Sequence, residues 1–150
     1  MIFSKIKDKK EILSWSMYDF ANQPFTNIIV TFVYSAFFTK IIAENEQSGT
    51  VLWANAIAVS AVTVALLSPI LGAIADNGGY RKFFLIFFTW ICAVFSILLF
   101  FPQEGDVFMA LSFFILANVS FEMGTVFCNS YLADFTDKEN VGEISGFAWG

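Results

Sequence analysis

Four long runs of apolar residues, separated by short polar segments, dominate this sequence. Each run is close to or longer than the ~20 residues that an α-helix needs to cross about 30 Å of hydrocarbon. The pattern therefore predicts an all-α fold, a bundle of membrane-spanning helices that follows a polar N-terminus over residues 1–12. The predicted spans cover Leu13 to Ile42, Val51 to Ala75, Phe83 to Phe101 and Val107 to Ala133, and a further helix is predicted from about Ile144. Because that last segment has barely begun at Gly150, we expect the chain to be the N-terminal portion of a longer protein.

The first run is longer than a minimal span and contains Pro24. Proline has no backbone N–H and leaves the carbonyl one turn earlier without its partner, so we predict that this helix is tilted or interrupted at Pro24. The lysines before the run are typical of a signal peptide. However, Asp19 and Asn22 lie in the apolar segment and no small-residue cleavage site follows it, which favours a retained membrane helix.

The composition supports a membrane protein and adds little chemistry. Hydrophobic residues make up 57% and charged residues 14% of the chain, whereas soluble domains carry about 25% charged residues. Cys92 and Cys128 lie inside apolar runs without metal-ligand spacing, and there is no histidine. We therefore expect no catalytic residues, no metal site, no cofactor and no nucleic-acid partner, and we expect that the protein is not an enzyme.

Basic residues are distributed unevenly between the two ends of the predicted helices. Seven of the eight lie in the N-terminus, in the Gly72 to Lys82 loop or after Ala133, whereas residues 43–50 and 102–106 contain only acidic charges. The positive-inside rule then predicts that the N-terminus faces the cytoplasm. We expect the protein to lie in a plasma or inner membrane. Trp15 and Trp53 lie near predicted helix ends, where we expect them to anchor the chain at the membrane interface.

Two stripes of polar side chains interrupt the apolar runs. A charge at the bilayer centre costs roughly 2.5–3.5 kcal/mol on insertion scales, so such residues require a reason to be there. Their spacing by three and four residues places each set on one face of a helix, which we expect to line the bundle interior or a wet cavity. The stripes comprise Asp19, Asn22, Gln23 and Thr26 in the first run, and Asn118, Glu122, Thr125 and Asn129 in the fourth. These eight residues are the predicted pathway for substrate or protons.

Glu122 is the most informative member of these stripes. It lies near the centre of its span without a basic neighbour in the sequence. Desolvation disfavours the charged form of a carboxyl, which suits a group that takes up and releases a proton. We hypothesise that Glu122 binds a proton or a cationic group of the substrate. The alternatives are a protonated glutamate bonded to a neighbouring helix, or one paired with an arginine elsewhere in the protein. For Asp19, a capping role at the start of its helix is as plausible as a substrate contact.

The second run carries a stripe of small residues, Ala61, Ala65, Ser68 and Gly72. Small side chains let a neighbouring helix approach closely in the membrane. We therefore expect this stripe to form either a static seam between helices or a sliding surface.

The loop between the second and third spans resembles a known motif. Its sequence, Gly72-x-Ile74-Ala75-Asp76-x-x-Gly79-x-Arg81, is similar to the signature G-x-L-A-D-x-x-G-x-[KR] between helices 2 and 3 of the major facilitator superfamily. It departs from that pattern at Asn77 and Tyr80, where basic residues are usual. The resemblance implies that Gly72, Asp76, Gly79 and Arg81 form a gating loop, which locks against the opposite half of a transporter. The alternative is an ordinary glycine-rich cytoplasmic turn. We expect Gly78 and Gly79 to supply positive φ angles that reverse the chain, and Arg81 or the N-terminus of another helix to offset the Asp76 charge.

Two further segments resemble one subgroup of that superfamily. Trp15-x-x-Tyr18-Asp19-x-Ala21-Asn22-x-x-Phe25 is similar to the first helix of the subgroup that includes the autophagy-related vacuolar amino-acid effluxer and its bacterial relatives. Asn129-Ser130-Tyr131-Leu132 and Ser145-Gly146-Phe147-Ala148-Trp149-Gly150 are similar to its fourth helix and the start of its fifth.

This resemblance implies a secondary transporter that moves a small polar solute, such as an amino acid, by alternating access. Proton coupling is a hypothesis that rests on Glu122. The implied partners are the lipid bilayer, the solute, protons and the remainder of the same chain. A non-transporting membrane scaffold or assembly subunit is the alternative, with polar stripes that only hold helices together. A membrane-embedded enzyme ranks third, because the chain has no histidine.

Overall fold

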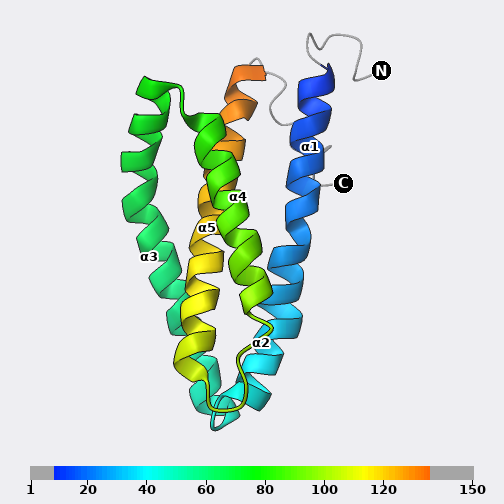
Figure 1. Cartoon of the computed structure of the whole chain (residues 1–150), viewed down its shortest axis with the longest axis vertical. Coiled ribbons are helices and arrows are strands. Elements are labelled where there is room, and N and C mark those ends of the chain that lie inside the picture. Colours follow the sequence, from blue (N-terminus) through cyan, green and yellow to red (C-terminus); the bar gives the residue numbers. More distant parts are fainter. Residues whose placement is uncertain (1–8, 136–150) are drawn as a thin grey trace.

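The computed structural model describes residues 9–135, which form four helical rods that run up and down (Figure 1). The first rod combines α1 (Lys9–Pro24), a π-helical segment (Phe25–Phe32), α2 (Val33–Phe37) and a second π-helical segment (Phe38–Ile42). The others are α3 (Glu46–Gly78), α4 (Arg81–Leu98) and α5 (Val107–Phe135). Within the described part, four helices are long and apolar enough to cross a membrane, which confirms the predicted all-α bundle. Residues 1–8 and the helix predicted from about Ile144 lie outside the described residues.

The interruption predicted at Pro24 takes the form of a widened helix. Pro24 is the last residue of α1, and the π-helical segment begins at the next residue. Here backbone hydrogen bonds span five residues instead of four, as in the bond from the Val33 N–H to the Ile28 carbonyl. The second π-helical segment closes in the same way, with the Ala43 N–H 2.9 Å from the Phe38 carbonyl oxygen. Proline therefore changes the hydrogen-bond register of the first rod without breaking it.

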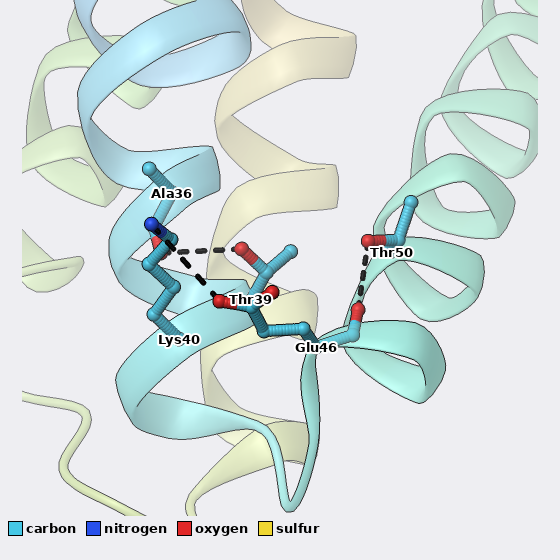
Figure 2. Close-up of polar contacts among 5 residues, drawn as sticks. All are labelled: Ala36, Thr39, Lys40, Glu46 and Thr50. Atoms are coloured by element: carbon cyan, nitrogen blue, oxygen red, sulfur yellow. Dashed lines mark hydrogen bonds and ion pairs between the residues drawn. The ribbon is translucent and has the colours of Figure 1, made fainter.

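The turn into α3 is fixed by capping. The Asn45 side chain accepts a hydrogen bond of 2.8 Å from the Ser48 N–H, as is typical of a helix N-cap. Figure 2 shows Lys40 reaching across the turn to Glu46, with 4.0 Å between Nζ and Oε1, and Thr50 donating its hydroxyl to the Glu46 carbonyl. Because both charged side chains are exposed, the ion pair adds little stability, and the cap determines where α3 begins.

The helix α5 is the centre of the bundle. It packs against the other three rods, and 44% of its most apolar stretch is buried, compared with 6–11% for the other spans. Two apolar clusters lie along it. The shared core, to which all four rods or their ends contribute, comprises Phe38, Ile42, Ala43, Trp53, Ala56, Leu99, Ala110 and Phe114. The three-helix core comprises Ala75, Phe88, Val119, Met123 and Phe127, from α3, α4 and α5 only.

The two ends of the bundle therefore differ. We call the end with the shared core the closed end, and the end with the α3–α4 loop the loop end (Figure 1). At the closed end, the connection from the first rod to α3 meets the connection from α4 to α5, because the Gly105 N–H donates a hydrogen bond of 3.0 Å to the Ile42 carbonyl. Gly105 has a φ of +90°, a conformation that glycine adopts without strain.

Candidate functional site

The polar stripe of α5 passes from the interior to an open surface. Asn118 is buried, with 6% of its surface exposed, whereas Thr125 is half-buried and Glu122 and Asn129 are exposed. The three-helix core occupies the other side of α5 at this level. The stripe therefore lies on a side of α5 that the other described helices leave uncovered toward the loop end.

The polar stripe of α1 lies beside its contact with α5. Asp19, Asn22, Gln23 and Thr26 are each partly exposed. Between residues 9 and 135, none of the eight polar side chains on the two helices hydrogen-bonds to another of the eight. Within this unit the stripes therefore do not hold α1 and α5 together.

Other residues form the seam between α1 and α5. The Trp15 Nε1–H donates a hydrogen bond of 3.0 Å to the Cys128 carbonyl, and the rings of Phe25 and Phe121 stack with centroids 4.6 Å apart. Between these two contacts, the Tyr18 hydroxyl lies close to Gly124: a Cβ added to Gly124 would be only 3.2 Å from the hydroxyl oxygen. Gly124 therefore lets helix α1 approach closely.

Tyr18 also fixes the position of α4 relative to this seam. Its hydroxyl oxygen lies 2.7 Å from the Thr89 hydroxyl of α4. The Thr89 hydroxyl is in turn within 2.7 Å of the Leu85 carbonyl, to which it can donate. Tyr18 thus joins α1, α4 and α5 on one side of the seam.

These contacts determine where the two polar stripes point. Successive residues of an α-helix lie about 100° apart. On α1 the stripe centred on Asp19 is therefore about a quarter turn from Tyr18, with the seam residue Trp15 at its edge, and on α5 the centre of the stripe is about a fifth of a turn from Phe121 and about a third of a turn from Gly124. Because α1 and α5 are antiparallel, these offsets turn both stripes to the same side of the seam, away from α4. We call this side the polar face.

The small-residue stripe of α3 lies toward the same side. On α3 it is about a quarter turn from the buried Trp53 and Ser60, and α3 runs parallel to α5. Ala61 and Ala65 are exposed, and a Cβ added to Gly72 would meet no atom within 4 Å. The stripe is therefore not a seam between the described helices; it borders the polar face.

The loop after α3 brings together three of its four predicted gating residues. The Arg81 Nε lies 2.7 Å from the Asp76 Oδ1, so Arg81 supplies the positive charge expected next to this carboxylate. Gly79 has a φ of +67° and ends α3, while the N–H groups of Gly79 and Tyr80 both point to the Ala75 carbonyl. The positive φ expected at Gly78 was wrong, because Gly78 is the last residue of α3 and has no positive φ. The Tyr80 ring occupies the place that a Cβ on Gly78 would take.

The expectation that Trp15 and Trp53 are interface anchors was also wrong. Their exposed fractions are 7% and 6%, and each indole N–H donates to a main-chain carbonyl of another rod, that of Cys128 for Trp15 and that of Val30 for Trp53. Position near a helix end suggested an anchor, but a buried carbonyl acceptor cannot be recognised from the sequence. Trp53, Tyr18 and Thr89 are therefore structural determinants of the site that sequence analysis missed.

Long apolar helices packed around α5, with charged and amide side chains on one uncovered side, define a multi-pass membrane protein with a polar face. Comparison with known families then identifies the group. The family described as "Vacuole effluxer Atg22 like" matches residues 44–143, and the chain belongs to this family.

Two curated proteins are similar to nearly the whole chain. The "Uncharacterized MFS-type transporter YxiO" of Bacillus subtilis (strain 168) is 32% identical over 145 residues, which are 94% of this chain and 34% of that protein. An "Uncharacterized protein" of Aquifex aeolicus (strain VF5) is 30% identical over 142 residues, which are 92% of this chain and 34% of that protein. The chain thus spans about a third of the length of these relatives. No solved structure matches it.

Proposed function

We propose that this chain forms the first four helices of a secondary transporter, which moves a small polar solute across the membrane by alternating access. The observation that carries the proposal is that the polar stripes of α1 and α5 share one uncovered side of an otherwise apolar bundle. Uncompensated carboxylates and amides are costly in lipid, so this side is expected to line a wet cavity. The remainder of the transporter would supply the opposite wall. The family favours an amino acid as the solute.

The residues of the polar face suit a zwitterionic or hydroxylated solute. Asn118 and Asn129 offer amide donors and acceptors, Thr125 offers a hydroxyl, and Asp19 and Glu122 offer carboxylates. Asn118 is the most buried of these residues, and Glu122 follows one turn closer to the loop end. A solute that enters from the loop end therefore meets Glu122 before Asn118.

The placement of basic residues favours a cytoplasmic loop end. Arg81 and Lys82 are the first residues of α4, directly after the α3–α4 loop, whereas residues 102–106 at the closed end carry only acidic charges. In this orientation the polar face opens toward the cytoplasm. The ion-paired Asp76 and Arg81 lie at its margin and are suited to a contact that changes when the two halves of the transporter rock.

A non-transporting scaffold is the alternative. It requires polar stripes that bond helices to one another, but the two stripes do not hydrogen-bond to each other in the described bundle. This observation favours a solute pathway over an internal adhesive role. A scaffold would transport none of the solutes offered to it, which the following experiment can detect.

Transport by the intact protein in proteoliposomes tests the proposal. A panel of radiolabelled amino acids and other small polar solutes would be offered with and without a pH gradient. If Glu122 carries the coupling proton, Glu122→Gln should abolish the stimulation by the gradient while counterflow exchange of the solute persists. Glu104→Gln, which removes an exposed carboxylate at the closed end, is the matched control. Unchanged gradient dependence in Glu122→Gln would refute the proton role, and no uptake of any solute by the parent would favour the scaffold.

A further inference from the structure

The π-helical segment Phe25–Phe32 lies between α1 and α2, in the middle of the first rod. Toward the loop end it is preceded by Asp19, Asn22 and Gln23 of the polar face, and toward the closed end it is followed by the buried Phe38 and Ile42. π-Helical turns inside α-helices are rare and are frequent at functional sites. This segment therefore separates the part of the rod that carries polar chemistry from the part that is anchored in the shared core.

Returning from π to α register leaves one carbonyl more than there are backbone donors. The last five-residue bond runs from Val33 to Ile28, and regular α-helix resumes at Val33, so the surplus acceptor lies between Ile29 and Phe32. Two carbonyls in this stretch receive side-chain donors. The Ser35 hydroxyl donates to Thr31 at 2.7 Å, and the Trp53 Nε1–H donates to Val30 at 3.2 Å.

Of these two donors, only Trp53 comes from another helix. Its ring is held firmly, with centroids 3.9 Å from Phe114, 5.3 Å from Phe38 and 5.9 Å from Tyr34. The indole N–H is therefore presented at a fixed point of the shared core. A carbonyl without a donor is unfavourable at membrane depth. Trp53 adds a donor from another helix to the stretch in which the wide register leaves one carbonyl too many, and a regular α-helix has no surplus acceptor there, so this bond favours the wide register.

We propose that Trp53 is a positioning residue that holds the first rod in its wide register, and that the rod can return to α-helix by releasing this bond. A shift by one residue turns one part of the rod against the other by roughly 100°. The closed-end part is fixed by Phe38 and Ile42, which have no exposed surface. The part that turns is therefore α1, and Asp19 and Asn22 leave or enter the polar face. This role rests on the proposed transport function, but the register itself does not.

Cross-linking of α1 to α5 in the intact chain tests the register directly. Phe25 and Phe121 stack in the wide register, so the double variant Phe25→Cys/Phe121→Cys should react efficiently with a short bis-methanethiosulfonate in membranes. The two native cysteines are first replaced by Cys92→Ala and Cys128→Ala. Trp53→Phe removes the indole donor but keeps an aromatic ring, and Pro24→Ala restores the missing backbone N–H. Each should lower the cross-linking yield at least threefold.

Trp90→Phe is the matched control, because it removes an indole that is 67% exposed on α4, and it should leave the yield unchanged. Unchanged yields in both Trp53→Phe and Pro24→Ala would overturn the proposal. A loss confined to Trp53→Phe would also overturn it, since that result reports loosened packing instead of a new register. If Trp53→Phe does not insert, Pro24→Ala decides alone. Because the yield requires no transport assay, its outcome is independent of whether a solute is moved.

Discussion

The closed end and the loop end of the bundle hold the first rod in different ways. At the closed end, Phe38 and Ile42 are fully buried in a core that they share with α3 and α5. At the loop end, the three-helix core contains no residue of α1, and the described part of α1 is attached by the bonds of Trp15 and Tyr18. The comparison teaches that one rod can be core at one end and a peripheral element at the other. Its fixed point is the closed end.

Removing the centre of the shared core should have the largest effect on stability. Phe114 has no exposed surface and its ring lies 3.9 Å from Trp53. We expect Phe114→Ala to cost about 3–5 kcal/mol, because it removes packing and leaves a cavity. The midpoint of thermal unfolding of the intact protein in detergent measures this loss. Phe108→Ala, at a position that is 86% exposed on the same helix, should change it little. Equal shifts for the two variants would contradict the assignment of the core.

Crowding at the closed end should have the next largest effect. A Cβ on Gly49 would lie 2.8 Å from the Ala43 Cβ and 3.0 Å from the Thr39 Cα, so Gly49→Ala must push the first rod away from α3. We expect a cost of about 1–3 kcal/mol in the same unfolding measurement. The comparison is Gly72→Ala, which meets nothing within the described bundle and should not destabilise it. A tolerated Gly49→Ala would show that the closed end is more plastic than its packing indicates.

The smallest effect on stability is expected at the loop end. Asp76→Asn removes an ion pair with Arg81 in which the Asp76 side chain is 58% exposed, so the cost should be at most about 1 kcal/mol. If the loop serves gating, the variant should slow transport while the apparent affinity for solute stays the same. Initial uptake rates over a range of solute concentrations separate these quantities. Asp106→Asn alters a carboxylate at the closed end and is the control. A large loss of affinity with normal turnover would contradict the gating role.

Features that depend on one helix, or on residues a few positions apart in the chain, could be predicted from the sequence. Hydropathy indicated the four spans, and Pro24 indicated a disturbance of the first, because a missing N–H acts locally. The charge on Asp76 required compensation, and Arg81 supplies it five residues later. The spacing of polar residues likewise predicted that each stripe occupies one face of its helix.

Features that depend on contacts between residues far apart in the chain could not be predicted in this way. The common side of the two stripes follows from Tyr18, Thr89 and Gly124, whose contacts join residues up to 106 positions apart in the chain (124 − 18 = 106). The wide register beyond Pro24 depends in the same way on Trp53, whose position near a predicted helix end suggested the membrane interface. Local spacing contains no information about which carbonyl a distant indole will find.

The hydrogen bond from Gly105 to the Ile42 carbonyl has a consequence for how the protein is made. Ile42 is synthesised long before Gly105, because the chain is made from its N-terminus. The carbonyl at the end of the first rod therefore waits in the growing chain for a partner on the second hairpin. Insertion of the second hairpin then completes the contact between the two connections, so the closed end cannot be complete before Gly105 has been added.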